Sequence, residues 1–265
     1  MLENEFVIQK NKNGISYLQF KKLLEYPELK HMYVLKNGNM NFKKVESIES
    51  LEKTYEKVCT LEGMNYKNVI RPTQNHTDEI KCVYKKIGEG PDLYLPEYEN
   101  VDGLLTDKSG LVLSTTNADC NLILLYDTKS KVIGNIHSGW KGTFKKIALK
   151  AVKKMKKEYN SNPEDIIAAL APSIGKCCFE VDEDVAKPCA EIFGYTNKLE
   201  KIITKKKDKY HIDTVLINKL LLEEAGLKKE NIIASNICSK CHSDEVHSRR
   251  AEGPNYGVGT LLVSK

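Results

Sequence analysis

The strongest constraint on the fold is a change in hydrophobic period near residue 139. Upstream lie three β-rich runs, "LVLSTT", "NLILLY" and "KVIGNI", and the short turn "DTKS" joins the last two. Downstream, apolar residues recur on one helical face while lysines occupy the other. The segment therefore predicts central strands, the last two paired as a hairpin, then a glycine-containing turn and an amphipathic helix with Thr143 as its N-cap.

Patterns elsewhere add strands and helices in mixed order. "FVIQKNKNGISYLQF" predicts two strands around an Asn-Gly turn, and "MYVL", "DIIAAL", "NIIASNI" and "GTLLVS" are further strand candidates. Helical spacing predicts an amphipathic helix from Ser47 to Leu61 that stops at Gly63. A short helix over "DEDVAKPCAEIF" is weakened by Pro188, and "DTVLINKLLLEEAG" predicts a capped helix. Because the elements do not strictly alternate, we expect one α+β domain over residues 1–265.

Composition narrows the classes of partner. The 265-residue chain is long enough to bury a substantial core, and its formal net charge of +5 comes from interspersed lysines and acids. "KKKDK" at 205–209 is expected to be a solvated loop, and no aromatic residues interleave with a basic stripe, so we expect no nucleic-acid partner. A modest positive charge suits small anions such as phosphate. "MLENEFVIQK" lacks a signal-peptide pattern and no 18-residue apolar run exists, so we expect a cytoplasmic protein with no membrane partner. The oligomeric state stays open.

The eight cysteines are expected to be free, mostly buried thiols in a reducing cytosol. "CSKCH" matches the attachment pattern of c-type haem, but that chemistry usually requires export. A structural zinc site needs four ligands, and no second Cys-x-x-Cys pair supplies them, so Cys238 and Cys241 are expected to be packed thiols near a functional loop. The adjacent Cys177 and Cys178 cannot both face the same way in an extended chain, and we expect at least one to pack internally.

Cys120 and His137 stand at the ends of two predicted buried strands. If these strands form a hairpin, the start of the first lies beside the end of the second, which brings the thiol and the imidazole together. Three interpretations remain open: a buried thiol beside a hydrogen-bonded imidazole, a Cys-His nucleophilic pair, or two ligands of a transition metal. A third ligand would favour the metal. The residues alone do not choose among the other histidines, which are His31, His76, His211, His242 and His247.

Five motifs, taken together, resemble a known family. "DGLLTD", "TTNADC", "IHSGWKGT", "APSIGKCCFEV" and "CSKCHSDEVHSRRAEGPNYGVG" follow the order and approximate spacing of the YfiH family, also described as polyphenol oxidase or laccase domain proteins. The resemblance runs from about Arg71 to the C-terminus. The first 70 residues match in outline, and "VLKNGNMNF" replaces the arginine- and glycine-rich turn of the family. The resemblance implies an α+β sandwich of four layers, two central mixed sheets flanked by helices.

The resemblance also implies a metal site. The histidine of the family's Q-x-H-G motif, the cysteine of A-D-C and the histidine of H-A-G-W fall on His76, Cys120 and His137. Thr77 and Ser138 stand where glycine and alanine are usual; neither removes a ligand, but Thr77 is expected to narrow the pocket beside His76. A His-Cys-His set suits Zn²⁺, and copper is the second candidate.

The activity implied by the resemblance is that of a purine nucleoside enzyme. Members are described as splitting adenosine, inosine and methylthioadenosine with phosphate and as deaminating adenosine, while an older family label is copper-dependent oxidation of phenols. Arg249 and Arg250 are candidates for the anion site, with surface solvation as the alternative for both, and backbone amides around Gly139 are another candidate. Asp119 and Glu180 are candidate proton carriers beside Cys120 and His137, and Asp119 is also a candidate acceptor that orients a metal ligand.

Other functions are kept as alternatives. Copper-dependent phenol oxidation conflicts with the absence of His-x-His pairs among only six histidines. A cysteine hydrolase acting on an amide of a cell-wall precursor would use Cys120 as nucleophile and His137 as base, and zinc bound through the cysteine would block it. A non-catalytic binding protein would hold the metal without turning over a nucleoside.

Overall fold

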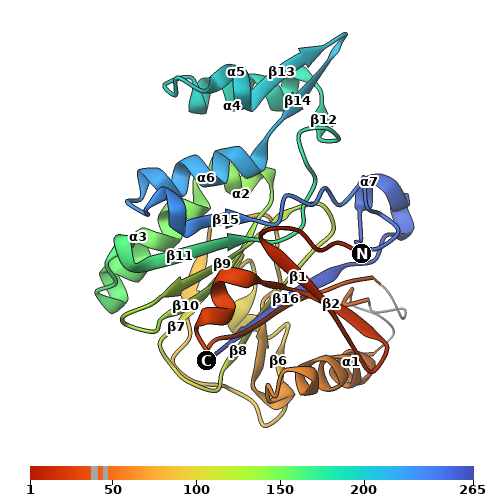
Figure 1. Ribbon diagram of the computed structural model, residues 1–265, viewed down its shortest axis with the longest axis vertical. Helices are drawn as coiled ribbons and strands as arrows, with labels where there is room; N and C mark the ends of the chain where they lie inside the picture. The colour runs from red at the N-terminus through yellow and green to blue at the C-terminus, as the bar shows by residue number, and fades with distance from the viewer. Residues whose placement is uncertain (37–40, 44–46) are drawn as a thin grey trace.

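The computed structural model describes residues 1–36, 41–43 and 47–265, and it contains two large mixed β-sheets with helices on their outer faces (Figure 1). The seven-stranded sheet has the order β1-β2-β3-β16-β8-β4-β6. Its strands are β1 (Val7–Lys12), β2 (Ile15–Phe20), β3 (Lys30–Val34), β4 (Val69–Arg71), β6 (Asp92–Leu93), β8 (Val112–Asn117) and β16 (Gly259–Ser264). Of the "VLKNGNMNF" turn, residues 37–40 lie outside the described residues.

The six-stranded sheet has the order β15-β11-β9-β10-β7-β5, and like its partner it combines parallel and antiparallel pairs. Its strands are β5 (Ile80–Cys82), β7 (Gly103–Thr106), β9 (Asn121–Asp127), β10 (Ile133–Ser138), β11 (Ile166–Leu170) and β15 (Ile232–Ala234). The helices are α1 (Ile48–Leu61), α2 (Trp140–Phe144), α3 (Ile147–Tyr159), α4 (Glu183–Phe193), α5 (Leu199–Ile202), α6 (Thr214–Glu224) and α7 (Arg249–Glu252).

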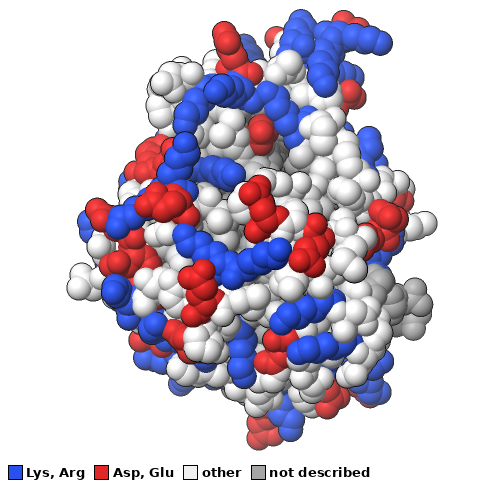
Figure 2. All heavy atoms as spheres, in the orientation of Figure 1, with Lys and Arg blue, Asp and Glu red and all other residues white. Residues whose placement is uncertain are grey.

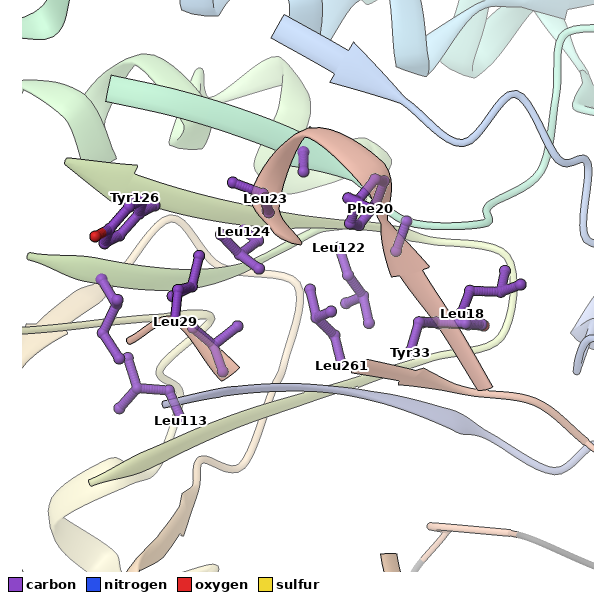
Figure 3. Close-up of a cluster of buried hydrophobic side chains, with 14 of the residues drawn as sticks. Leu18, Phe20, Leu23, Leu29, Tyr33, Leu113, Leu122, Leu124, Tyr126 and Leu261 are labelled. Carbon is purple, nitrogen blue, oxygen red and sulfur yellow. The ribbon is translucent and has the colours of Figure 1, made fainter. Parts of the chain in front are cut away.

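The molecule has four layers, as expected for the fold class. One apolar cluster fills the space between the sheets, where Leu113 and Leu261 of one sheet face Leu122 and Leu124 of the other (Figure 3). A second cluster joins α1 to the outer face of the seven-stranded sheet, and a third joins α2, α3, α4 and α6 to the outer face of the six-stranded sheet. Since β9 is buried at every residue, its unbroken apolar run is explained by coverage on both faces. That residues 1–265 form one domain stays a prediction.

The expected hairpin is present, and it places the two strand ends side by side. β9 and β10 pair antiparallel in a register that sets Leu122 opposite His137 and Asn121 opposite Ser138. Cys120 directly precedes β9 and therefore lies at the same edge of the sheet. The first of the three β-rich runs, β8, is central as well, but it belongs to the other sheet. The chain thus crosses between the sheets at residues 118–120, beside the end of β10.

The helical segment after this hairpin differs from the prediction at its start. Thr143 is not an N-cap, because it lies inside α2, and Lys146 (φ 62°) separates that helix from α3. The Thr143 hydroxyl is instead 2.8 Å from Ser138 Oγ in a buried polar network that includes Asn218. The prediction at α1 is confirmed, since Ser47 caps it and the left-handed Gly63 (φ 62°) follows its end.

The lysine-rich segment also differs from the expected loop. Lys205 and Lys206 belong to β13 (Ile203–Lys206) and Lys209 to β14 (Lys209–Ile212), which form an exposed hairpin in a three-stranded sheet with β12 (Glu180–Val181). Elsewhere on the face shown in Figure 2, basic and acidic side chains are interspersed, as the sequence suggested. Among the described residues, no helix is both long enough and apolar enough to cross a membrane.

Candidate active site

Three side chains predicted to bind a metal converge where the chain crosses between the sheets. The ligand atoms of His76, Cys120 and His137 all lie within 4.8 Å of one another. Cys120 Sγ is 3.7 Å from His76 Nε2, and the two imidazole rings meet edge to face with their centroids 5.0 Å apart. Two imidazoles and one thiolate form a donor set that suits Zn²⁺ and also copper. Three protein ligands leave a fourth position for water or substrate.

Asp102, for which no role was predicted, supports two of these ligands. Its buried carboxylate lies 2.6 Å from His137 Nδ1, which directs the Nε2 atom of that ring toward the other two ligands. The same carboxylate accepts hydrogen bonds from the backbone N–H groups of Asn75, His76 and Thr77, at 3.2, 3.1 and 2.7 Å. These bonds hold His76 in a left-handed conformation (φ 58°). The "DGLLTD" motif contained this residue and was the signal available for it.

The half-buried Cys120 thiol and the buried His137 imidazole shift each other's ionisation. Burial opposes ionisation of Cys120, but the charge of His137 and the hydrogen bonds from both histidines outweigh it and lower the pKa of the thiol to about 6. Burial also disfavours a charged His137, yet the charge of Cys120 and the hydrogen bond to Asp102 raise the pKa of the imidazole to about 9. The site therefore stabilises a thiolate at neutral pH, which is the form that binds a metal.

Gly139 packs directly against two of the ligand side chains. A Cβ atom at this position would be 2.5 Å from His76 Cδ2 and 3.2 Å from Cys120 Sγ, so the close approach requires glycine. The helix that follows, α2, has only five residues. In its first turn the Thr143 N–H donates a hydrogen bond to the Gly139 carbonyl. The expected role of Gly139 in substrate binding stays a prediction, and the structure adds this packing requirement.

Thr77 and Ser138 differ from the residues usual in the family motifs, but the three ligands still converge. The Thr77 hydroxyl donates a hydrogen bond to the Asn100 carbonyl at 2.8 Å and lies 2.6 Å from the Asp102 carboxylate. Thr77 is not among the residues that line the cavity, and the expected narrowing beside His76 stays a prediction. Ser138, which lines the cavity, donates a hydrogen bond from its Oγ to Asn218 Oδ1 at 3.0 Å, and an alanine could not make this bond.

Asp119 organises the C-terminal arm of the site, residues 238–250, instead of orienting a metal ligand. Its carboxylate accepts hydrogen bonds from Ser239 Oγ and Ser248 Oγ, both at 2.6 Å, and from the Arg250 N–H at 2.8 Å. The position expected for an acceptor beside His137 is filled by Asp102. Asp119 still lines the cavity, so its role as a proton carrier stays a prediction.

The two predicted arginines reach the same cavity. Arg250 Nη1 donates to the Glu180 carbonyl at 2.9 Å, and its guanidinium lies 6.0 Å from the centroid of the Phe179 ring. The Arg249 guanidinium lies 5.8 Å from the centroid of the Tyr256 ring, and in the described part of the chain no hydrogen bond or ion pair occupies it. The Glu180 carboxylate is 3.6 Å from His211 Nε2, and Glu180 does not line the cavity.

The cavity has a volume of about 570 Å³, within the usual range for small-molecule sites. His76, Cys120 and His137 line it together with both arginines. Its walls also include aromatic and amide side chains that the sequence did not single out, namely Gln74, Asn117, Asn121, Trp140, Phe179 and Tyr256. Gln74 fixes the His76 loop to β8, because its amide exchanges two 2.8 Å hydrogen bonds with the backbone of Thr116.

The fold and this cavity define a class: a four-layer α+β protein with a His-Cys-His centre between its sheets. Residues 30–264 match the family model described as multi-copper polyphenol oxidoreductase laccase, and the chain belongs to that family. Two solved structures share the fold. They are YlmD from Geobacillus stearothermophilus (TM-score 0.85, 21% identity, 99% of each chain) and hypothetical protein YfiH of Bacillus licheniformis (TM-score 0.84, 24% identity, 97% of this chain and 98% of that one).

Curated relatives carry names of enzymes. The chain is 28% identical over 262 residues to the human purine nucleoside phosphorylase LACC1, covering 95% of this chain and 53% of that protein. It is 27% identical over 236 residues to the purine nucleoside phosphorylase YlmD of Bacillus subtilis, covering 85% and 84%. It is 30% identical over 197 residues to adenosine deaminase RL5 of an unknown prokaryote, covering 74% of each. The chain thus spans about half the length of the human relative and most of the two prokaryotic ones.

Proposed function

We propose that this protein is a metal-dependent purine nucleoside phosphorylase that also deaminates adenosine. The single observation that carries the proposal is that one cavity is lined both by a His-Cys-His centre and by Arg249, whose guanidinium has no hydrogen bond or ion pair to the described residues. The names of the relatives supply the substrate class.

Phosphorolysis requires an anion site, and Arg249 is best placed to provide it. Its guanidinium faces the cavity without an ion-pair partner among the described residues, and the planar fork suits phosphate oxygens. Arg250 is held by the Glu180 carbonyl and would add positive charge from a fixed position. In the reaction a phosphate oxygen bonds to ribose C1′, the bond from C1′ to the purine nitrogen breaks, and the departing base takes up a proton.

The base requires an apolar surface and polar groups that orient it. Phe179 and Tyr256 offer aromatic rings in the cavity, and Gln74, Asn117 and Asn121 offer amides. His76, Cys120 and His137 would hold Zn²⁺, with copper as the second candidate. When bound, such an ion supplies Lewis acidity and activates water near neutral pH, as deamination requires. Asp102 keeps His137 in the orientation that ligation needs.

The test is product analysis with zinc-loaded protein. Inosine and phosphate should give hypoxanthine and ribose 1-phosphate. When phosphate is left out, adenosine should still be converted to inosine. His76→Ala should abolish both reactions together with zinc binding at the His-Cys-His centre. Arg249→Ala should raise the KM for phosphate about tenfold or more and spare deamination. Lys205→Ala is the control: it removes a charge in the three-stranded sheet and should change neither the KM for phosphate nor the deamination. Zinc-loaded protein that performs neither reaction would refute the proposal.

A second candidate function is favoured by one observation. The lowered pKa of Cys120 and the raised pKa of His137 describe a thiolate-imidazolium pair, which suits a cysteine hydrolase acting on an amide. A metal and an attacking thiolate cannot share the sulfur. Stoichiometric zinc lost in Cys120→Ala therefore excludes the hydrolase, whereas metal-free protein alkylated rapidly at Cys120 would support it. Oxygen uptake with a phenol and copper would instead support the oxidase named by the family.

A further inference from the structure

A second group of metal-type ligands lies outside the His-Cys-His centre. The Sγ atoms of Cys177, Cys178, Cys238 and Cys241 all lie within 4.8 Å of one another, and all four thiols are free. Cys241 Sγ is 3.5 Å from Cys178 Sγ and 3.7 Å from Cys177 Sγ. The sequence-based expectation that four ligands could not be assembled here was wrong, because the second pair is a Cys-Cys dipeptide and not a Cys-x-x-Cys motif.

Backbone pairing explains why these distant residues meet. β11 and β15 run parallel, and the pairing continues past both strands through a bridge between Ser173 and Cys238. The Ser239 N–H donates to the Ser173 carbonyl at 3.0 Å, and the Ser173 N–H donates to the Ile237 carbonyl at 3.3 Å. The two cysteine-bearing segments therefore leave the sheet side by side.

A turn lets the adjacent cysteines face the same point. The N–H groups of Cys178 and Phe179 both donate to the Gly175 carbonyl at 2.9 Å, so the chain forms a turn here and is not extended. The Gly175 N–H donates to Cys238 Sγ at 3.3 Å. A Cβ atom on Gly175 would lie 3.2 Å from Cys177 Sγ, so the turn packs tightly against the sulfurs.

The spacing of the sulfurs is that of a tetrahedral tetrathiolate site. Four sulfurs placed about 2.3 Å from a central zinc ion are separated by about 3.8 Å. The two separations to Cys241 Sγ are close to this value, and the remaining ones lie within 4.8 Å. Disulfide bonds would need separations of about 2.05 Å. Four cysteines also fill all coordination positions, which is the mark of a structural site.

We propose that Cys177, Cys178, Cys238 and Cys241 bind a second, structural Zn²⁺ ion. Binding releases the thiol protons and leaves four zinc-sulfur bonds without any change in oxidation state. The site shares no ligand with the His-Cys-His centre.

The proposed zinc ion would connect two segments that form walls of the cavity. One cysteine pair is flanked by Ile174 and Phe179, which line the cavity, and the other belongs to the arm that carries Arg249 and Arg250. The zinc would tie these two walls together at their base. Other contacts between the two walls include the bond from Arg250 Nη1 to the Glu180 carbonyl and the bridge beside Ser173.

Metal analysis tests the proposal independently of catalysis. Protein purified under reducing conditions without chelator should contain two zinc ions per chain by elemental analysis. Cys241→Ser and Cys178→Ser should each contain one, and His76→Ala should contain the other one. Cys82→Ser, which changes a free cysteine outside the group, should keep both. Unchanged zinc content in Cys241→Ser and Cys178→Ser would overturn the proposal.

A spectroscopic measurement covers the case in which the cysteine variants fail to fold. His76→Ala isolates the four-cysteine group in an otherwise intact chain. After zinc or cobalt loading, X-ray absorption should show a shell of four sulfurs near 2.3 Å, and cobalt should give intense thiolate charge-transfer bands. A shell dominated by nitrogen or oxygen, or two disulfides found by mass spectrometry in freshly purified reduced protein, would refute a zinc site. Neither readout depends on nucleoside turnover.

Discussion

Asp102 holds His137 at two points: its carboxylate lies 2.6 Å from Nδ1, and its carbonyl accepts the His137 N–H at 2.7 Å. The same carboxylate accepts the His76 N–H at 3.1 Å. Two ligands that lie far apart in the sequence therefore depend on one side chain. Because this side chain is fully buried, the loss of any of these bonds would leave an unpaired polar group, which is costly.

Asp102→Asn should weaken zinc binding by about 10–100-fold, because an amide cannot accept all of these bonds and leaves His137 less well oriented. Competition with a chromophoric chelator measures the affinity directly. Activity should fall at limiting zinc and recover in part with excess metal. Asp208→Asn, in the exposed hairpin, is the control and should bind zinc like the parent protein. An affinity within twofold of the parent value would contradict this role.

Gly139→Ala should disrupt the centre, since its Cβ would fall 2.5 Å from His76 Cδ2. We expect zinc affinity and turnover to drop at least tenfold while the circular dichroism spectrum stays unchanged. Gly90→Ala is the matched control, because its Cβ would approach no atom closer than 3.8 Å. Equal zinc affinities for the two variants would show that the His76 loop adapts freely.

Asp119→Asn should loosen the arm of residues 238–250 without removing the metal. An amide can still accept from Ser239 or Ser248, but it loses the negative charge and presents an N–H₂ group to the Arg250 N–H. We expect faster hydrogen exchange across the arm and a higher KM for phosphate, with unchanged zinc content in the His-Cys-His centre. A loss of turnover at saturating phosphate, with the arm still protected from exchange, would point instead to proton transfer by Asp119.

His31 should make folding sensitive to mild acid. Burial lowers its pKa from 6.5 to about 4, and its Nε2 accepts the Phe20 N–H at 2.9 Å. His31 therefore binds a proton more readily in the unfolded chain than in the folded one. The stability that the neutral, buried imidazole contributes is complete above pH 6.5 and is lost as the pH falls toward 4. Between pH 7 and 5 the loss amounts to about 2 kcal/mol in the free energy of unfolding. Urea denaturation should show a weaker pH dependence for His31→Gln, but an unchanged one for the exposed His242→Gln.

The sequence predicted much of the fold because hydrophobic period reports burial directly. The hairpin of β9 and β10 and the helix that ends just before Gly63 both follow from local patterns. The assignment of β8 to a different sheet did not follow, because a buried strand looks the same in either sheet. Thr143 failed as a cap since its hydroxyl is recruited by Ser138, a tertiary contact that no local pattern reveals.

In the candidate site, too, residues within sequence motifs could be predicted, whereas residues brought together only by tertiary contacts could not. The three metal-type ligands came from motif resemblance, and the structure brings them together. Asp102 was missed because it acts through space, 35 residues away from His137. The four cysteines were missed because their convergence depends on a parallel strand pair and a turn, both of which are set by packing elsewhere.

The position of β16 has a consequence for how the chain is made. This strand, residues 259–264, lies between β3 and β8 near the middle of the seven-stranded sheet (Figure 1). Strands from the first 35 residues are therefore separated from β8 until β16 has been synthesised. During translation the sheet remains in two halves with exposed edges, and the space between the layers closes only when residues 259–264 leave the ribosome. A stalled or truncated chain would present those edges to chaperones and proteases.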